Sequence, residues 1–429
     1  MRLTTIVRKL ATVVDVVYGF LVSTPVVGQS ATQLNVISAN TVTGRSAVSE
    51  DGPMSSPRLN TTELGPVTVI DEPTLESLPA YRASVQLKRF YLPFVIVAGT
   101  FGNIVVVVIH CRLPPNQRSS MSVYFTALAI SDTTTLWMGN FEMLETFGVT
   151  LTVEYHVQRH YSDIVIDALC RIRAWISYAF NQMSAWILVA MTTHRAVSIV
   201  WPHGTRKLSK RCTAVMVVVS IVSFCALTNA HLLYGHSFQA TTDNQTAVCS
   251  DSFVSDEYRM FFRLGWVWID MMMAMFLPFA GLLVTNTVLV RKVGQSLREA
   301  RDSLAEGRSD PFASRDKKLS SMTITLIATS VAFLVLTSPI VVYMIWYGTL
   351  PYDVLSDVRW RAASELAASV SLMLWYTNLG INLYLYCLTG ARYRAEFLKL
   401  FGCGGSTDRT FRHTPPSAVG RPSLQAACP

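Results

Sequence analysis

Charged residues are scarce in this chain of 429 residues. Asp, Glu, Lys and Arg make up 15% of it, whereas hydrophobic residues make up 51%. Soluble globular domains carry about a quarter charged residues, so the deficit argues against a soluble domain. The chain also shows no internal repeat and no pair of broken apolar segments, features that are typical of many transporters. We therefore expect a membrane protein, and a transporter is a less favoured alternative.

The residues of a catalytic metal centre are also missing. An intramembrane hydrolase needs histidines and carboxylates clustered around zinc. His156 and His160 are four residues apart, but no third ligand can be placed near them. We expect no enzyme and no cofactor, and a hydrolase is a second less favoured alternative.

Long apolar segments, in contrast, are abundant. Each holds the roughly 20 apolar residues that a membrane-spanning helix needs. Backbone groups cannot be left unsatisfied in lipid, and runs this continuous do not fit alternating barrel strands, so the segments are predicted to be helices. Seven segments qualify: 89–112, 121–147, 167–200, 211–235, 258–292, 318–347 and 362–388. The predicted fold class is an all-α membrane protein, a seven-transmembrane helix bundle with a short amphipathic eighth helix.

The net charge of +8 is explained by where the basic residues lie. Lys and Arg cluster after the first, third, fifth and seventh predicted spans, which all fall on one side of a seven-span topology. Such an excess marks the cytoplasmic side. We therefore expect a multi-pass protein of the plasma membrane with an extracellular N-terminus, the lipid bilayer as its environment and no nucleic-acid partner.

The chain ends differ in composition from the apolar segments. Residues 1–28 place basic residues before an apolar stretch and resemble a cleavable signal peptide. Residues 29–87 are rich in Ser, Thr, Asn and Pro, which is typical of a disordered extracellular tail. The predicted transmembrane domain covers 88–390, an amphipathic membrane-surface helix covers 391–403, and a cytoplasmic tail covers 404–429.

Several candidate modification sites agree with this orientation. The sequons at Asn60 and Asn244 both fall on the predicted outer side, where glycosylation occurs. Of eight cysteines, only Cys170 and Cys249 map to this oxidising side, so a disulfide between them is the economical pairing. On the inner side, Cys403 ends the amphipathic helix and is a candidate for palmitoylation, with a free thiol as the alternative.

One arginine lies at the end of an apolar run, within the stretch from Ser184 to Pro202. This residue is Arg195. A charged side chain inside a membrane is energetically costly unless it reaches water, pairs with another group or has a function. At about 1.5 Å per residue, roughly 37 Å of helix separates it from Cys170, which is enough to cross a bilayer core of about 30 Å. The alternative is that Arg195 has no specific function and is one of the basic residues that usually flank the cytoplasmic ends of membrane helices.

Five polar residues inside the predicted spans are candidates for a functional site. They are Asn103, Asp132, Ser184, Asn378 and Asn382. Together they would form one cluster at mid-membrane, able to hold water or a hard cation through oxygen ligands. The alternative for each is a hydrogen bond between helices, and for five together we favour a functional cluster.

These residues resemble the motifs of the rhodopsin-like (class A) G-protein-coupled receptors over roughly 88–403. A lone Gly-Asn pair or a lone proline would be weak evidence, whereas an ordered set with one match per helix is specific. The set is Gly102-Asn103, Leu128-Ala129 with Asp132, Cys170 and Arg195, Pro202, Pro278, Phe333 with Pro339, and Asn382 with Tyr386.

The resemblance implies a signalling function. In this family an extracellular ligand shifts an equilibrium between inactive and active helix arrangements, and a heterotrimeric G protein binds on the cytoplasmic side. It implies that Arg195 and Tyr386, together with His194, serve G-protein coupling, and arrestin is a further expected partner. It also implies that the polar cluster is a sodium site, with the ion as an allosteric ligand, and that Pro278 and Pro339 kink their helices.

Some positions depart from the family pattern. His194 stands where an acidic residue usually precedes the arginine, Thr337 stands where a tryptophan is usual, and Leu383 replaces the proline after Asn382. In addition, Leu319 stands where the sixth helix would offer a second carboxylate to pair with Arg195. We therefore predict raised basal activity, and the alternative is a receptor-like protein with atypical or constitutive coupling.

Further departures from the family pattern narrow the class of ligand. Ser177 stands where amine receptors place an aspartate, and 362–388 lacks the lysine that opsins need. The run YTNLGINLYLYCLTGARYR with Trp201-Pro202 resembles invertebrate FMRFamide-type neuropeptide receptors, which implies a peptide ligand. Acidic and aromatic residues at the outer helix ends could pair the arginine and phenyl ring of an amidated peptide, although aromatic belts lie there in any case. The candidate pocket residues are Glu142, Glu145, Ser177, Asp270, Trp266 and Tyr376.

Overall fold

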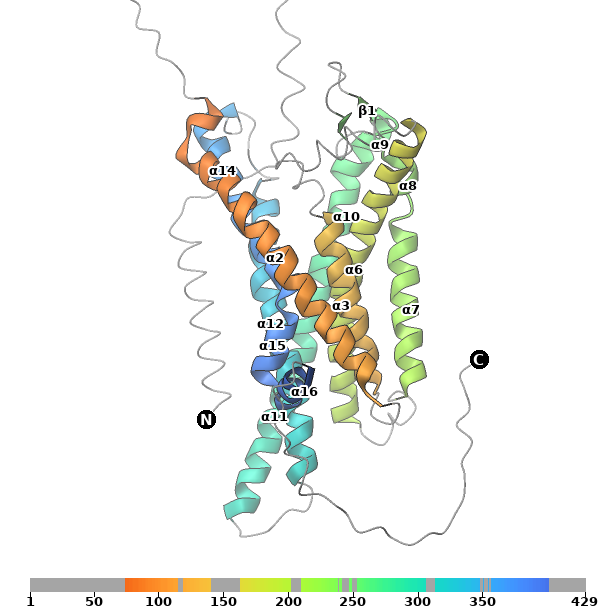
Figure 1. The fold of residues 1–429 in the computed structure, drawn as a ribbon, viewed down its shortest axis with the longest axis vertical. Helices are drawn as coiled ribbons and strands as arrows, with labels where there is room; N and C mark the ends of the chain where they lie inside the picture. The colour runs from red at the N-terminus through yellow and green to blue at the C-terminus, as the bar shows by residue number, and fades with distance from the viewer. Residues whose placement is uncertain are drawn as a thin grey trace, which may run out of the picture. The chain divides into compact units, whose positions relative to one another are not determined.

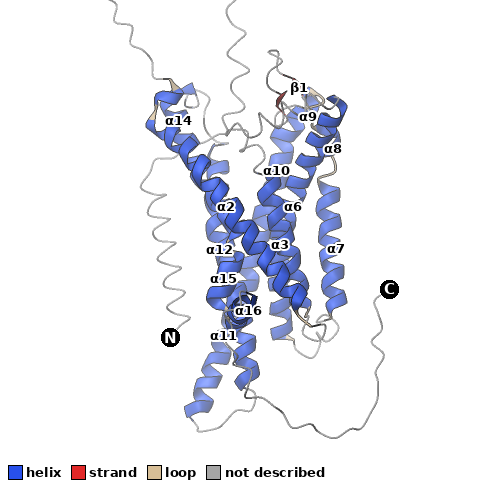
Figure 2. Ribbon diagram, in the orientation of Figure 1, coloured by secondary structure: helices blue, strands red, loops and turns tan. Residues whose placement is uncertain are grey.

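Long helices make up nearly all of the described part of the chain (Figure 1). The computed structural model describes residues 74–114, 119–139, 163–201, 210–237, 239–240, 247–248, 253–305, 313–347, 350, 354 and 356–400. Figure 2 shows the one described strand pair, in which β1 (Gln239–Ala240) runs antiparallel to β2 (Ala247–Val248). The predicted signal peptide, the N-terminal tail up to residue 73 and the tail from 401 lie outside these ranges.

The helices follow the predicted order along the chain. They are η2 (Leu75–Ser77), α2 (Pro79–Arg112), α3 (Ser120–Gly139), α6 (Asp163–Val200), α7 (Arg211–Thr228), α8 (Leu232–Gly235), α9 (Asp256–Phe261), η5 (Phe262–Trp266), α10 (Val267–Met271), η6 (Met272–Phe276), α11 (Leu277–Ala305), α12 (Ala313–Tyr347), α14 (Val358–Gly380), α15 (Asn382–Thr389) and α16 (Ala391–Leu400). Of these, η5 and η6 are π-helical turns.

Five helical stretches in the described residues are long and apolar enough to cross a membrane. They are Pro79–Arg112, Asp167–Val200, Arg211–Gly235, Asp256–Gln295 and Ser321–Tyr347. The two remaining predicted spans are also helical, in α3 and in α14 with α15. The predicted all-α membrane fold is thus confirmed, as expected for a chain that must satisfy its backbone groups internally in lipid.

Several predicted boundaries and continuities were wrong. The first helix begins at Pro79, ten residues before the apolar run, because polar residues extend it. The fourth predicted span is interrupted after Thr228, and the last is broken at Ile381. The fifth contains the two π-helical turns. The amphipathic helix α16 begins at Ala391, as predicted, and its predicted end at residue 403 lies outside the described residues. Hydropathy locates an apolar run but does not register these local changes of the backbone hydrogen-bond pattern.

Contacts divide the chain into two units. One consists of Met1–Gln86 with Tyr343–Val370, and the other of Leu87–Val342 with Ser371–Pro429. The second unit contains the larger buried core, whose centre is formed by large fully buried side chains. They include Tyr124, Phe125, Ile187, Met191, Leu282, Leu326 and Tyr386. Every site described below lies within this second unit, where α6 contacts α3, α7, α8 and α11.

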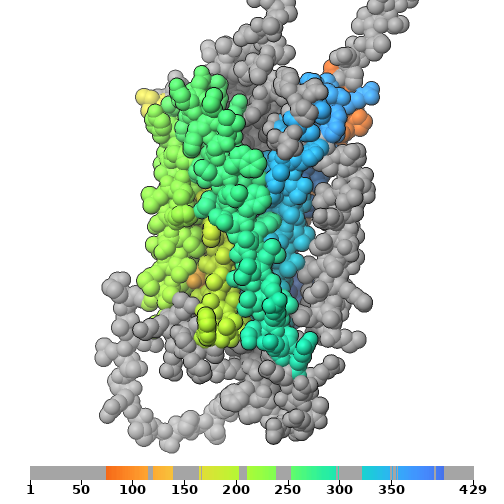
Figure 3. All heavy atoms as spheres, turned by 180° about the vertical axis from the view of Figure 1, so that it is seen from behind, coloured from red at the N-terminus to blue at the C-terminus, as the bar shows by residue number. Residues whose placement is uncertain are grey.

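Apolar side chains also cover surfaces that face away from the core. In α7 they include Met216, Val219 and Leu227, and in α11 Leu283 and Val284. Figure 3 shows this part of the molecule, with α7 and the segment from α9 to α11 on the face turned to the viewer. Exposed apolar surface of this extent is what a lipid-contacting helix requires.

Candidate functional site

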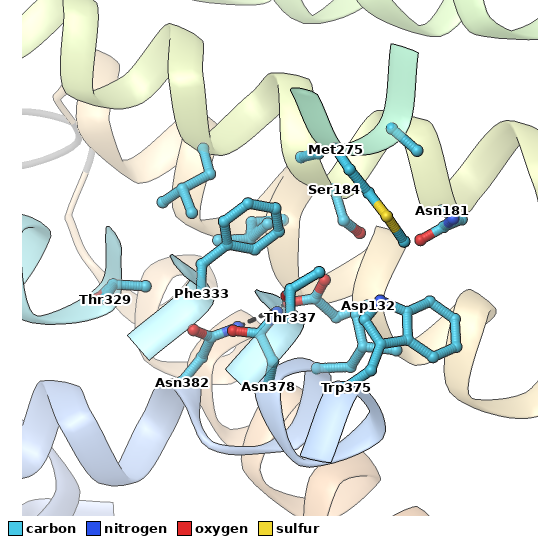
Figure 4. Close-up of a pocket in the computed structure, with 15 residues that line it drawn as sticks. Asp132, Asn181, Ser184, Met275, Thr329, Phe333, Thr337, Trp375, Asn378 and Asn382 are labelled. Atoms are coloured by element: carbon cyan, nitrogen blue, oxygen red, sulfur yellow. Dashed lines mark hydrogen bonds between the residues drawn. The ribbon is translucent and has the colours of Figure 1, made fainter. Parts of the chain in front are cut away.

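A small buried cavity lies among α3, α6, η6, α12, α14 and α15 (Figure 4). It has room for about one or two water molecules. Its polar lining residues are Asp132, Asn181, Ser184, Thr329, Thr337, Asn378 and Asn382, and its larger apolar ones are Phe333, Met275 and Trp375. The structure therefore brings together four of the five residues of the predicted polar cluster.

Asp132 is the acidic residue of this cavity. It is only 2% exposed, and its Oδ2 accepts a 2.6 Å hydrogen bond from Nδ2 of Asn382. On the α6 side, Ser184 donates to Oγ of Ser131, 2.9 Å away, which in turn donates to the carbonyl of Phe180. These bonds tie α3 to α6 and to α15 at the depth of the cavity.

The donor set of the cavity fits a small hard cation. Asp132 supplies a carboxylate, Ser184 a hydroxyl oxygen, and Asn378 and Asn382 amide oxygens, which are the ligand types that hard cations prefer. Lys, Arg and His are absent from the lining residues. A cation held there would neutralise the buried carboxylate, whose charge is otherwise costly in this apolar setting.

Asn103, the fifth member of the predicted cluster, does not line the cavity. Its Nδ2 donates to the carbonyl of Leu379 at 3.1 Å, just before the helix break at Ile381. Asn103 thus satisfies a carbonyl that lies at the interruption between α14 and α15. Glycines allow this approach, since a Cβ placed on Gly380 would lie 2.9 Å from Cα of Gly99.

Arg195 lies near the end of α6 and is 8% exposed. Its Nε donates a 3.1 Å hydrogen bond to Oγ1 of Thr323 on α12. Thr323 was not predicted, because it is uncharged and lies far from Arg195 along the chain. The bond links the two helices at one end of the bundle by a neutral acceptor, in place of the carboxylate sought at Leu319.

His194 turns away from this bond toward α3. Its Nε2 lies 3.3 Å from Oγ of Ser120, and its Nδ1 lies 3.4 Å from the hydroxyl of Tyr124. The ring is 7% exposed and packs edge-on against Tyr124. Two hydroxyl groups suit a neutral imidazole, which donates with one nitrogen and accepts with the other.

Tyr386 belongs to a buried aromatic cluster near the same end of the bundle. Its ring centroid lies 4.9 Å from that of Phe125 and 5.0 Å from that of Tyr393 on α16. The Tyr393 hydroxyl forms a 2.7 Å hydrogen bond with Nε2 of His110, which stacks on Phe125. The cluster fixes α16 against α2, α3 and α15.

The predicted ligand residue Asp270 belongs to a chain of amide hydrogen bonds. Asn229 donates to Gln182 at 2.9 Å, and Gln182 donates to Oδ1 of Asp270 at 2.8 Å. Asn229 and Gln182 are fully buried and were not predicted. The chain connects α6 with the end of α7 and with α10, and Asp270 is not among the residues that line the Asp132 cavity.

The segment around Asp270 is flanked by the two π-helical turns. Trp266, in the first turn, is 4% exposed and lies with its ring centroid 4.0 Å from that of His231. In the second turn, the carbonyl of Met273 accepts a 2.9 Å bond from Nε1 of Trp186. Such turns release backbone carbonyls and often occur at functional sites. Pro278 follows them at the start of α11.

The remaining ligand candidates are dispersed. Ser177 is half-buried on α6, and Tyr376 is buried and lies 4.7 Å from Trp375, centroid to centroid. Neither lines the Asp132 cavity. Glu142 and Glu145 lie outside the described residues. Pro339, which was predicted to kink its helix, is buried inside α12.

Cys170 is disulfide-bonded, whereas Cys249, its predicted partner, lies outside the described residues. Cys212, which the predicted topology places on the reducing side, is also disulfide-bonded, a bond that was not predicted. Near the end of α6 that carries Cys170, burial and then the charge of Arg173 lower the pKa of His236 to about 4. The glycosylation sites Asn60 and Asn244 and the lipidation site Cys403 also lie outside the described part.

Comparisons with known proteins agree on one family. Residues 102–386 match the family described as 7 transmembrane receptor (rhodopsin family). Type-1 angiotensin II receptor B of Xenopus laevis is 23% identical over 310 residues, 71% of this chain and 76% of the relative. B1 bradykinin receptor of Macaca fascicularis is 23% identical over 71% of this chain and 79% of the relative. Cysteinyl leukotriene receptor 1 of Mus musculus is 23% identical over 54% of this chain and 61% of the relative.

Proposed function

This chain belongs to the rhodopsin family of seven-transmembrane receptors, and we propose that it is a receptor for an extracellular peptide that activates a heterotrimeric G protein. It is a multi-pass membrane protein and not an enzyme. In the proposed orientation, the N-terminus is extracellular and the ends of α6 and α12 that carry Arg195 and Thr323 are cytoplasmic. The basic clusters beside those ends support this orientation.

The observation that carries the proposal is the hydrogen bond between Arg195 and Thr323. It holds α6 and α12 together at the end where a G protein would have to enter. Opening the bundle there breaks the bond and frees the Arg195 guanidinium to donate to the G protein. Ligand binding then has only to stabilise the separated arrangement relative to the closed one.

A threonine hydroxyl holds an arginine less firmly than a carboxylate does, since bonds between two charged partners are shorter and stronger. The bond between Arg195 and Thr323 therefore restrains the closed state less than an ion pair at that place would. This supports the prediction of raised basal activity. Constitutive coupling without any ligand is the second candidate function, and it rests on the same bond.

Two further features support a peptide ligand. The relatives include receptors named for angiotensin II and bradykinin, which are peptides. In addition, Asp270 on α10 carries a carboxylate, whose Oδ1 accepts from Gln182, and a carboxylate is the group that would pair with a cationic side chain of a peptide. An amidated peptide of the FMRFamide type, with a basic residue, is the specific ligand class that we propose.

We also propose that the Asp132 cavity binds sodium and that the ion favours the closed state. Asp132, Ser184, Asn378 and Asn382 would hold it, and it would supply a positive charge against the buried carboxylate. The cavity joins α3, α6, α12 and α14, so a bound ion stabilises their close packing. Separation of these helices would disperse the ligands and weaken binding.

A peptide screen tests the receptor function. Cells that carry this chain with a promiscuous Gα subunit are exposed to amidated peptides, and calcium release is measured. We expect a response to a peptide with a basic residue near its amidated end, and no response in cells carrying Arg195→Ala at equal surface expression. High signalling without peptide, also lost in Arg195→Ala, would favour constitutive coupling. No Arg195-dependent signal with any Gα would contradict both candidates.

A further inference from the structure

Thr337 carries a buried hydroxyl whose hydrogen bond is missing. It is 1% exposed, and its Oγ1 has no partner among the described residues. Other hydroxyls of α12 bond to their own helix: Thr325, Thr329 and Ser330 each donate to the carbonyl four residues earlier. That arrangement is the usual one in apolar helices. An unsatisfied buried hydroxyl is costly, so Thr337 is suited to a partner inside the cavity.

The cavity has two distinguishable ends (Figure 4). Asn181, Met275 and Trp375 lie at one end, and Phe333 and Thr329 at the other. Helix direction gives the same order. Trp375 precedes Asn378 and Asn382 on α14, whereas Thr337 follows Thr329 and Phe333 on α12. In the proposed orientation, Trp375 and Thr337 therefore lie on the side nearer the extracellular ends.

Trp375 is the largest side chain at that end. It lies one turn before Asn378, so both side chains lie on the same side of α14. Its ring rests against Tyr376, with centroids 4.7 Å apart, and packs onto the cluster that contains Leu92 and Leu136. The packing holds the ring over the cavity from α14.

A small residue at position 337 is matched by a large one at position 375. A cavity with room for about one or two water molecules cannot accept two indole rings at the same end. Threonine, a small side chain, stands at position 337, where a tryptophan is usual in such receptors, and Trp375 of α14 lines the same cavity.

We propose that Trp375 closes the cation cavity on its extracellular side, and that the Thr337 hydroxyl binds a water enclosed beneath it. This inference rests on the proposed sodium site. A closed site strengthens the attraction between the cation and Asp132, because bulk solvent no longer screens it. Ligand binding that displaces the ring toward the extracellular side would admit water and release the cation. Ligand binding is then communicated to the cavity through α14.

The test measures sodium-dependent stability, which needs no ligand. The purified protein in lipid nanodiscs is heated at constant ionic strength while NaCl replaces choline chloride. The concentration of sodium that gives half of the stabilisation is recorded. The variants are Trp375→Ala, Trp375→Phe and the double variant Trp375→Ala with Thr337→Trp. Trp268→Ala serves as the control, because Trp268 is 49% exposed on α10 and does not line the cavity.

We expect Trp375→Ala to raise the half-maximal sodium concentration by on the order of tenfold. Trp375→Phe should raise it less, the double variant should restore it, and Trp268→Ala should match the wild type. Equal sodium dependence in Trp375→Phe, Trp375→Ala and the wild type would overturn the closing role while leaving the sodium site intact. If Trp375→Ala does not fold, the Phe and double variants decide. A wild type that sodium does not stabilise, indistinguishable from Asp132→Asn, would overturn the sodium site and the closing role together.

Discussion

Replacing Thr323 by valine tests the bond between α6 and α12 at the ends that we propose to be cytoplasmic. Valine keeps the shape of threonine but removes the hydroxyl that accepts from Arg195. Both residues are buried, with Thr323 1% and Arg195 8% exposed. Hydrogen bonds to charged groups contribute about 1.5–3 kcal/mol, and about 1.4 kcal/mol corresponds to a tenfold change in an equilibrium constant. The ratio of open to closed receptor should therefore rise by about tenfold or more.

The assay is basal guanine-nucleotide exchange on purified G protein with the receptor in nanodiscs. Thr323→Val should increase the basal rate, whereas Thr323→Ser, which retains the hydroxyl, should remain close to the wild type. Ser330→Ala is the matched control, since Ser330 is also buried on α12 but donates to Leu326 within its own helix. A folded Thr323→Val protein with an unchanged basal rate would show that this bond does not restrain the closed state.

Three other substitutions have defined outcomes. Gly380→Ala places a Cβ 2.9 Å from Cα of Gly99 and should lower thermal stability and surface expression. Gly294→Ala, whose Cβ would have nothing within 4 Å, should change neither. Equal effects of the two substitutions would contradict the close packing of Gly380 on Gly99. Asn103→Leu leaves a buried carbonyl at the helix break unpaired and should cost about 1–3 kcal/mol of stability, measured by thermal unfolding; no loss would exclude the capping role. His194→Asp places a carboxylate beside the arginine and should lower basal exchange, and an unchanged rate would refute this.

The large-scale fold could be predicted because lipid leaves the backbone few choices. Apolar runs of sufficient length must become helices, and the basic residues beside them indicate the cytoplasmic side. The break at Ile381 could not be read from hydropathy. It depends on Gly380 approaching Gly99 and on Asn103 reaching a carbonyl far along the chain.

The candidate site shows the same division. Asp132 and Asn382 were predicted as members of one cluster, since ionisable and amide groups inside apolar helices have few alternatives. Asn103 was predicted to belong to the same cluster, but it does not line the cavity. The sequence offers no sign that would distinguish it from the other four residues. Thr323 was missed because a single threonine is unremarkable in a sequence. Only the packing of α12 on α6 brings its hydroxyl to Arg195.

The central claim is that this chain activates a G protein through Arg195. The most direct measurement is the rate of nucleotide exchange on a panel of purified heterotrimers, comparing the wild type in nanodiscs with Arg195→Ala at matched thermal stability. Basal activity makes the comparison possible before a ligand is known. We expect faster exchange on at least one heterotrimer with the wild type and loss of that acceleration in the variant. Acceleration that persists in Arg195→Ala would contradict the central claim.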